Sequence, residues 1–567
     1  MRTCSRRGFW HAWRLPAGPP WRIAVLLLIV VLPLAFGPSA GSAESTLPPG
    51  VDPDHLNEFG EFFTVIGSFE GDEQWVGGSA NPSLRRHQGQ AWTLTSTNGA
   101  DSMTTRVFDP PLDLTMFESS GTASDENDYI DLWGYQHDTN LQAGSIHLDA
   151  SPPGQEWTDY FSYYTLGVNE AGWRYLHVPK GLDPNLNDNK VEAWMKTGDP
   201  SWSSIVRARI SIRSLPQTTS SFTFDLWRMV SADTAFVPRE PRHGVNVRCD
   251  QDGVDPDAIV AKAKELGAEW VRLPFRWNEI EKEGPGEFAY KDCYEDVVEQ
   301  ADDEGLTVLA VLFGTPEWAR KESCKALGEH CPPADPNSIK PLIADMKAEF
   351  GDGIRYWEIW NEPNSPGFFH GEDASEYVPL LRAAYEEIQS IDPSDTVILG
   401  GIYDDGEMPI AWMDQFYAAG GGAYAEVMAF HPYTSQNDPK AAVVMSPWNY
   451  RGHTRAMRAI MAVYGDTPLD TDLWATEFGF STSDSPWCDG QKRPCTDSEQ
   501  GQLTVDAYDI AENSALIQGF FVYELVNQQP EGETPRSHEG NFGLLKYTTT
   551  SLPKKASFGI VKNRFLP

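Results

Sequence analysis

Residues 355–364 have the sequence Arg-Tyr-Trp-Glu-Ile-Trp-Asn-Glu-Pro-Asn, in which a short apolar segment ends in a polar Asn-Glu-Pro element. A second segment of this kind, Leu-Trp-Ala-Thr-Glu-Phe-Gly, occupies residues 473–479 and also carries a glutamate near its end. Short apolar runs of this length are typical of buried strands. Helical patterns separate such runs along the C-terminal part of the chain, and this alternation indicates a parallel sheet.

The alternation of strands and helices extends over residues 243–567. Strands are predicted at 243–248, 269–274, 306–313, 355–360, 396–401, 426–430, 473–476 and 519–524, and helices at 255–266, 290–304, 338–350, 376–391, 451–464, 501–518 and 554–565. Eight units of this kind predict an α/β fold, the (β/α)8 or TIM barrel. Active sites of such barrels lie at the C-terminal ends of the strands. Glu362 and Glu477, at the ends of the fourth and seventh strands, are therefore expected at one face.

Residues 51–235 have a different pattern, in which short strands are separated by turn residues without long helical segments. Strands are predicted at 62–69, 91–97, 129–135, 144–149, 173–178, 204–212 and 221–230. This spacing predicts an all-β sandwich preceding the barrel. Its last strands, at 172–179, 202–212 and 224–226, resemble those of galactose-binding-like jelly rolls, so the domain is interpreted as carbohydrate-binding-like. A role as a scaffold or lid is the alternative. A Pro-containing linker follows at 235–242.

The N-terminus has the features of a targeting segment. Five arginines precede an apolar run at 23–36, and small residues follow at 41–43. A membrane-spanning helix needs about 20 apolar residues, more than this run offers. Residues 1–43 are therefore predicted to be a signal peptide cleaved near Ala43, which makes the protein secreted or extracytoplasmic and leaves no stable membrane span. A retained N-terminal anchor is the alternative.

Six cysteines remain after the predicted cleavage: Cys249, Cys293, Cys324, Cys331, Cys488 and Cys495. An even number in an exported protein indicates disulfides. The short spacings predict Cys324–Cys331 and Cys488–Cys495, with Cys249–Cys293 as the remaining pair. A zinc site would require CxxC spacing or paired histidines, which are missing near these cysteines. No metal and no cofactor are predicted.

The formal net charge of -38 excludes a class of partners. An acidic surface repels phosphate backbones, so nucleic-acid binding is not expected. Twenty tryptophans, 20 tyrosines and 27 phenylalanines are consistent with core packing and also with stacking on sugar rings.

Two glutamates at one face of a barrel indicate a particular chemistry. Glycoside hydrolysis uses two carboxyl groups that flank the scissile bond. One must stay protonated to donate to the leaving oxygen, and the other must stay ionised. Glu362 and Glu477 have this placement.

The barrel resembles glycoside hydrolase clan A. The segments at 360–364, 315–319 and 474–479 are most similar to family 39, and families 5 and 30 are alternatives. The resemblance implies a retaining mechanism with Glu362 as acid/base and Glu477 as nucleophile, so that their carboxyl groups should lie about 5–5.5 Å apart. It also implies that Asn361 contacts the sugar 2-hydroxyl.

The resemblance assigns further substrate-binding residues one at a time. Arg272 matches an arginine beside the nucleophile, and Arg276 is the alternative candidate for this role. His431 and Tyr433 match a pair on the sixth strand, in which Tyr433 is the expected hydrogen-bond partner of Glu477. Many clan members place a tryptophan on the eighth strand, where this chain has Tyr523 as a candidate substitute. The remaining candidates are Trp277 and Trp318 as sugar platforms, whereas Glu317 and Glu358 are interpreted as structural.

The expected function is that of a retaining β-glycoside hydrolase acting on extracellular oligo- or polysaccharides. A non-catalytic carbohydrate-binding protein and a transglycosylase on the same barrel are the alternatives.

Overall fold

The computed structural model describes residues 61–566 apart from 70–72, 82–89, 115–128, 153, 167–170, 180–194, 235–239, 250, 252–253, 372, 404–409, 435–437, 441–449, 469, 485–487, 489–492 and 549–550. The predicted signal peptide, residues 1–43, lies outside the described residues. None of the helices in the described part of the chain combines the length and the apolar character that a membrane crossing needs.

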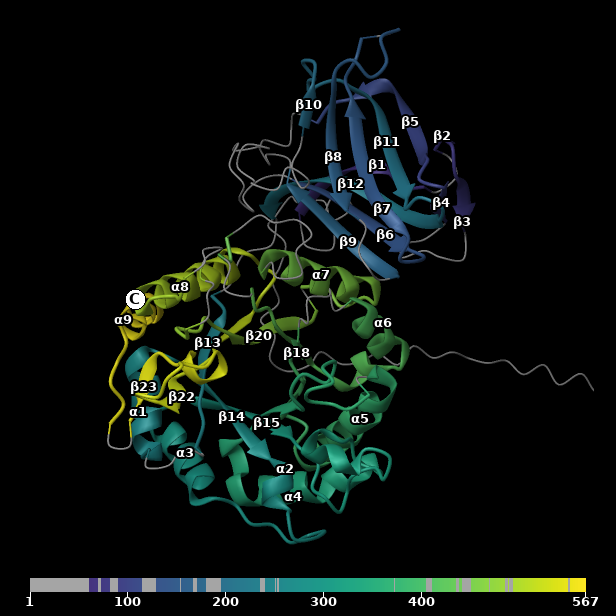
Figure 1. Cartoon of the computed structure of the whole chain (residues 1–567). Helices are drawn as coiled ribbons and strands as arrows, with labels where there is room; N and C mark the ends of the chain where they lie inside the picture. Colours follow the sequence, from purple (N-terminus) through teal and green to yellow (C-terminus); the bar gives the residue numbers. More distant parts are fainter. Residues whose placement is uncertain are drawn as a thin grey trace, which may run out of the picture. The chain divides into compact units, whose positions relative to one another are not determined.

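The N-terminal half consists of two antiparallel sheets (Figure 1). One contains β1 (Glu61–Gly67), β3 (Ser79–Asn81), β4 (Ala91–Thr97), β6 (Tyr129–Gln136), β9 (Gly172–Pro179) and β12 (Thr219–Thr234), in the order β3-β4-β12-β6-β9 with β1 paired to β12. The other contains β2 (Trp75–Val76), β5 (Asp101–Leu112), β7 (Leu141–Asp149), β8 (Tyr160–Leu166), β10 (Met195–Thr197) and β11 (Ile205–Ser214), in the order β10-β8-β7-β11-β5-β2.

Alternation of side chains along the strands forms the core of the sandwich. In β11, Ala208, Ile210 and Ile212 are buried, whereas Arg209 and Ser211 between them are not. Because successive side chains of a strand point to opposite faces, one face of this sheet packs against the other sheet and one carries polar groups. The predicted sandwich is confirmed.

The C-terminal half is a closed parallel barrel of β13 (Arg242–Asn246), β14 (Trp270–Arg276), β15 (Thr307–Phe313), β16 (Tyr356–Ile359), β17 (Thr396–Leu399), β19 (Val427–His431), β20 (Asp472–Phe478) and β21 (Gly519–Val522). Pairing of β13 with β21 and of β17 with β19 closes it, and the short β18 (Ile402–Tyr403) pairs with β19. The interior is filled by side chains from different strands, among them Trp270, Trp474 and Phe521. It is therefore a packed core, as in other barrels of this type.

Helices surround the strands (Figure 1). They are α1 (Pro256–Leu266), α2 (Trp277–Ile280), α3 (Asp292–Asp303), α4 (Lys340–Phe350), α5 (Ala374–Ile391), α6 (Ile410–Ala418), α7 (Tyr450–Val463), α8 (Asp497–Asn513) and α9 (Ala556–Phe565). Short 3-10 helices lie at η2 (Lys325–His330), η3 (Pro336–Ile339), η4 (Gly351–Gly353), η5 (Gly421–Tyr424) and η6 (Glu539–Asn541), and β22 (Val526–Pro530) pairs with β23 (Leu545–Tyr547). The predicted barrel is confirmed.

Several elements differ from the sequence-based prediction. Strands β5 and β8 were not predicted, because β5 contains two prolines and the Tyr-rich segment of β8 follows a loop rich in turn residues. Helix α8 begins earlier than predicted, because Thr496 and Glu499 form a reciprocal capping box at its N-terminus. Capping, rather than apolar periodicity, sets that boundary.

Candidate active site

Glu362 lies just after β16 in an unusual backbone conformation. Its φ is +48°, and that of Trp360 is +74°, a region that residues other than glycine rarely adopt. The Trp360 ring is fully buried and its Nε1 donates to the Phe368 carbonyl at 2.8 Å, while the Glu362 amide donates to the Gly401 carbonyl at 3.1 Å. Such strain costs on the order of 1–3 kcal/mol per residue and is concentrated at functional sites. The surrounding contacts thus hold the Glu362 carboxyl group in place.

Glu477 comes from β20 and is also nearly buried, with 8% of its surface exposed. Its Oε1 lies 2.5 Å from Arg272 Nη1, and its Oε2 accepts a hydrogen bond from the Tyr433 hydroxyl at 3.0 Å. Hydrogen bonds to a carboxylate from charged and neutral donors stabilise the ionised form. The predicted contacts of Arg272 and Tyr433 with Glu477 are both present in the structure.

Arg272 uses every N–H of its guanidinium group. Nε and Nη2 form a pair of bonds with Glu358 at 2.7 and 3.0 Å, Nη1 donates to Asn246 Oδ1 and to Glu477, and Nη2 also donates to Asn361 Oδ1 at 2.8 Å. A guanidinium offers five donors in a fixed plane. Since all five are occupied, Arg272 cannot rotate without breaking this network, and it fixes the positions of Glu477 and Asn361 together.

His431 lies between the two glutamates. Its Nδ1 is 2.8 Å from Glu362 Oε1 and 3.7 Å from Glu477 Oε2, and its Nε2 is 3.2 Å from Thr476 Oγ1. The ring is fully buried. A side chain at Gly401 would not fit, because a Cβ there would lie 2.1 Å from His431 Nε2. The glycine therefore makes room for the histidine beside Glu362.

The two carboxyl groups have opposite electrostatic environments. Burial raises the pKa of Glu362, and the hydrogen bond and charge of His431 offset this only in part. Burial alone would also raise the pKa of Glu477, but the charges of His431 and Arg272 and the hydrogen bonds from Tyr433 and Arg272 outweigh burial and lower it. Two carboxyls whose pKa values are driven apart are suited to acid and base roles.

Glu362, His431 and Glu477 also have the residue types and spacing of a possible cation site, since one ligand atom of each lies within 4.8 Å of the others. A divalent ion at this place would lie close to the Arg272 guanidinium, 2.5 Å from Glu477. Repulsion between the two positive charges disfavours such an ion. The donor set therefore fits proton transfer better than metal binding.

The two glutamates open into a cleft of about 760 Å³. Sites for small molecules commonly have volumes of about 300–1,000 Å³. Tyr523, the candidate substrate-binding residue of the eighth strand, lines this cleft. A cluster of polar side chains, Arg248, Glu524 and Gln528, lies next to it. Arg248 Nη2 and Gln528 Nε2 both donate to the Tyr523 hydroxyl, at 3.0 and 2.9 Å, and the same two side chains donate to Glu524.

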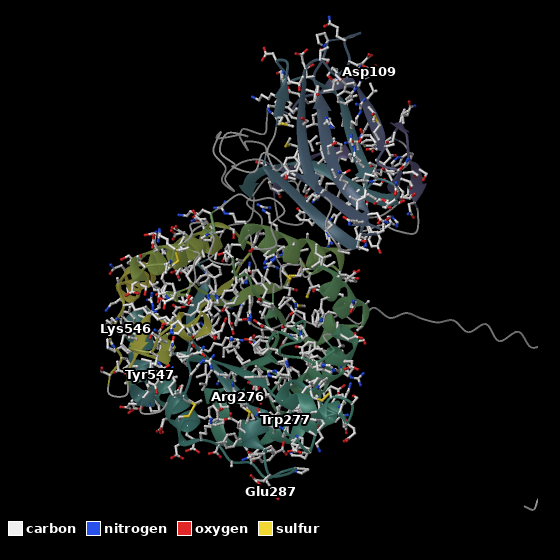
Figure 2. The ribbon with its side chains drawn as sticks, in the orientation of Figure 1. Asp109, Arg276, Trp277, Glu287, Lys546 and Tyr547 are labelled. Carbon is white, nitrogen blue, oxygen red and sulfur yellow. A yellow bond between two sulfur atoms is a disulfide. The ribbon has the colours of Figure 1, made fainter. Side chains whose placement is uncertain are left out.

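The two candidate sugar platforms do not line this cleft. Trp277 in α2 has no exposed surface, and its Nε1 donates to Glu281 at 2.6 Å. Trp318 packs at 86° to it and donates to the Glu281 carbonyl. The expectation for Trp277 was wrong, because a fully buried ring cannot stack on a sugar. Figure 2 labels Trp277 next to Arg276, whose guanidinium lies 3.4 Å from Glu329 rather than near Glu477.

Other residues of the site were not selected from the sequence. Glu358 is fully buried and accepts from the Gly401 amide and Thr476 as well as from Arg272. Glu524 is 1% exposed, and burial raises its pKa to about 7. A charged residue inside an apolar strand, as at Glu358, is the signal that could have identified it, because a buried charge needs a partner.

The structure joins the cysteines in the three predicted pairs, Cys249–Cys293, Cys324–Cys331 and Cys488–Cys495. Cys249 lines the cleft, and the loop closed by Cys324–Cys331 contributes Glu329 and His330 to the lining. Two of the disulfides thus border the cleft.

The chain is similar to several known proteins. The profile of the family described as Cellulase (glycosyl hydrolase family 5) matches residues 243–513. None of the curated proteins matches the sequence significantly. Among solved structures, the chain is similar to a family 39 glycoside hydrolase from Bacteroides cellulosilyticus WH2, with 18% identity over 76% of this chain and 79% of that one and a TM-score of 0.45.

Two further solved structures are similar to a little over half of the chain. A monomeric β-xylosidase from Caulobacter crescentus CB15 has 18% identity over 57% of this chain and 69% of its own, with a TM-score of 0.42. A β-glucosidase from Thermotoga maritima has 14% identity over 58% of this chain and 98% of its own, with a TM-score of 0.39. The profile match over residues 243–513 and the closed parallel barrel, with glutamates at the ends of its fourth and seventh strands, indicate that this protein is a glycosidase with a barrel similar to those of glycoside hydrolase clan A.

Proposed function

We propose that this glycosidase is a retaining β-glycoside hydrolase that acts through Glu477 as nucleophile and Glu362 as acid/base. The observation that supports this most directly is the short distance between them, since one oxygen of each carboxyl group lies within 4.8 Å of the other. Retaining enzymes hold their carboxyl groups about 5–5.5 Å apart, and inverting enzymes about 6.5–9.5 Å. A spacing this short leaves no room for a water molecule with a sugar.

In the first step, a carboxylate oxygen of Glu477 attacks the anomeric carbon while Glu362 gives its proton to the departing glycosidic oxygen. The lowered pKa of Glu477 keeps the nucleophile ionised, and the raised pKa of Glu362 keeps the acid protonated. Arg272 and Tyr433 orient the attacking carboxylate, because each bonds to a different oxygen of Glu477.

In the second step, Glu362 acts as a base toward water. Once Glu477 is bound to the sugar as an ester, its negative charge is gone. That charge is one of the causes that raise the pKa of Glu362, so the pKa should fall in the intermediate. The same residue can therefore donate a proton in one step and accept one from water in the next.

Substrate contacts follow from the groups that face the cleft. The Oδ1 of Asn361 is occupied by Arg272, which leaves its amide nitrogen for a sugar hydroxyl. Tyr523 provides a ring beside Tyr433, with ring centres 6.3 Å apart. A cleft of about 760 Å³ supports an oligo- or polysaccharide substrate rather than a single sugar unit.

We place this activity outside the cytoplasm, with the barrel at 243–567 as the catalytic domain and the sandwich at 51–235 as an accessory domain. The three disulfides are consistent with an oxidising compartment. The basic and apolar N-terminal segment supports export through a cleaved signal.

Azide rescue tests the two roles separately. Glu477→Ala should abolish turnover of an activated aryl β-glycoside, because no covalent intermediate can form. Glu362→Ala should still be glycosylated by such a substrate and should then accumulate the intermediate. Azide needs no general base, so it should restore turnover to Glu362→Ala and yield the β-glycosyl azide, whereas rescue of Glu477→Ala should yield the α-azide.

Glu317→Ala is a matched control, because Glu317 is an exposed glutamate of the same barrel outside the cleft. It should keep full activity without azide. Reversed anomers would exchange the two roles, and full activity of both active-site variants would refute the proposal. A steady-state assay and proton NMR of the products distinguish these results.

A further inference from the structure

We propose that the β-sandwich carries a separate binding site for an uncharged polysaccharide, formed by Trp157 on the outer face of the sheet that contains β7, β8 and β11. Trp157 lies in the connection between β7 and β8, outside both strands. Its φ is +61°, a conformation that costs on the order of 1–3 kcal/mol for a non-glycine residue. The loop thus holds a large aromatic ring in a strained position, and ligand sites are among the places where such strain is concentrated.

The contacts of Trp157 show which way its ring faces. The Arg209 guanidinium lies over the ring, 3.7 Å from its centre. The rings of His147 and Tyr160 lie at 6.2 and 6.0 Å from it, at 86° and 76°. Arg209, His147 and Tyr160 all belong to strands of the sheet, so one face of the indole lies on the sheet. The ring is nonetheless partly exposed, and its other face is therefore directed toward solvent.

The surface under the ring is organised by the strand register. Arg209 of β11 lies directly opposite His147 of β7 and Thr105 of β5, and its Nε donates to Thr105 Oγ1 at 3.2 Å. His147 Nε2 is 2.9 Å from Ser145 Oγ, which is 2.6 Å from Ser211 Oγ. A row of hydrogen-bonded polar side chains therefore lies on the same face of the sheet as the partly exposed ring.

This combination fits a sugar. The C–H groups on one side of an equatorially substituted pyranose pack on an aromatic ring, while its hydroxyl groups point outward to hydrogen-bonding partners. Hydrogen-bonding side chains of this kind, among them Arg209 and Ser211, lie on the same face of the sheet as Trp157. Neither the ring nor this polar row belongs to the catalytic cleft.

Charge on this face favours an uncharged glycan. Arg207 is paired with Asp149 at 2.5 Å and with Glu156 at 3.3 Å, and Arg213 is paired with Asp101 at 2.7 Å. Most of the positive charge on the face is therefore compensated within the sheet. A chain with a net charge of -38 would also repel an anionic polymer at long range.

Affinity electrophoresis in native gels tests this site. The Glu477→Gln background prevents digestion of the polymer, and the gels contain mixed-linkage β-glucan, arabinoxylan or galactomannan, with polygalacturonate as the charged comparison. The protein should be retarded by at least one neutral polymer. Trp157→Ala should weaken that binding about tenfold, which corresponds to the loss of one aromatic stacking contact. In the protein with Glu477 intact, Trp157→Ala should hydrolyse a small aryl glycoside at the same rate as the parent protein.

Tyr464→Ala is the matched control, because Tyr464 is a 41% exposed aromatic residue on the barrel that stacks on Tyr417. Its binding should equal that of the parent protein. Should Trp157→Ala fail to fold, Trp157→Tyr keeps a smaller ring over Arg209 and should show a measurable but lesser loss. Equal binding by the parent and the folded Trp157 variants would overturn the proposal, as would retardation by polygalacturonate alone or by none of the polymers. These outcomes do not depend on turnover, so they are distinct from a failure of the proposed activity.

Discussion

Removal of the Tyr433 hydroxyl should shift the pH dependence of this enzyme in a direction that the structure fixes. The hydroxyl donates to Glu477 Oε2 at 3.0 Å and so stabilises the carboxylate form. In Tyr433→Phe this bond is lost, while the bond from Arg272 to the other oxygen remains. The pKa of Glu477 should therefore rise toward its ordinary value.

The size of the shift follows from the strength of the bond. A hydrogen bond to a charged group contributes about 1.5–3 kcal/mol, and one pKa unit corresponds to about 1.4 kcal/mol. The pKa of Glu477 should rise by about 1–2 units in Tyr433→Phe. Because the nucleophile must be ionised, the acidic limb of kcat/KM should move to higher pH by the same amount. The basic limb, which reports Glu362, should move much less.

The measurement is kcat/KM for an activated aryl β-glycoside across the pH range in which the protein stays folded. Tyr523→Phe is the matched control, since Tyr523 lies in the same cleft but its hydroxyl accepts from Arg248 and Gln528 instead of bonding to Glu477. It should leave the acidic limb in place. An unchanged limb in Tyr433→Phe, or a shift to lower pH, would refute this account of how Glu477 is kept ionised.

Two further predictions concern stability. Burial raises the pKa of Glu524 to about 7, so the folded state binds this proton more tightly than the unfolded chain. The contribution of this proton to stability is present below about pH 4.3 and is lost as pH rises to about 7, a change of about 3.7 kcal/mol. Glu524→Gln should remove this change from the pH dependence of the unfolding free energy. Loss of the Cys249–Cys293 bridge, with a separation of 44 residues, should destabilise the protein by about 4 kcal/mol, against about 2.5 kcal/mol for Cys324–Cys331, with a separation of 7. Urea unfolding of the paired Cys→Ser variants measures this, and an equal loss for both bridges would contradict the loop-length argument.

The barrel was predictable because its signals are local. Each strand is a short apolar run and each helix has its own periodicity, so the alternation is visible without knowing which elements touch. The same holds for the two glutamates: Glu362 follows β16 and Glu477 lies near the end of β20, so both must lie at one end of a parallel barrel. Elements with weak local signals were missed, such as β5, which contains Pro110 and Pro111.

The environment of each side chain was not predictable in this way. Trp277 and Trp318 are both tryptophans near strand ends, yet the structure buries Trp277 completely and packs Trp318 against it. The aromatic ring that we propose as a sugar platform instead is Trp157, a partly exposed residue in a loop of the other domain. Exposure depends on which elements pack on a residue, and that is decided by contacts far along the chain.

The sequence by itself determined the order of strands and helices and the two glutamates at the strand ends, because these depend on neighbouring residues. Only the tertiary structure decided how the glutamates differ. The charges of His431 and Arg272 and the hydrogen bond from Tyr433 outweigh burial and lower the pKa of Glu477, and Arg272 and Tyr433 lie 205 and 44 residues from it in the sequence. Burial raises the pKa of Glu362, and His431 offsets this only in part. Electrostatic interactions depend on distance in space, so identical side chains acquire different pKa values only when the chain is folded.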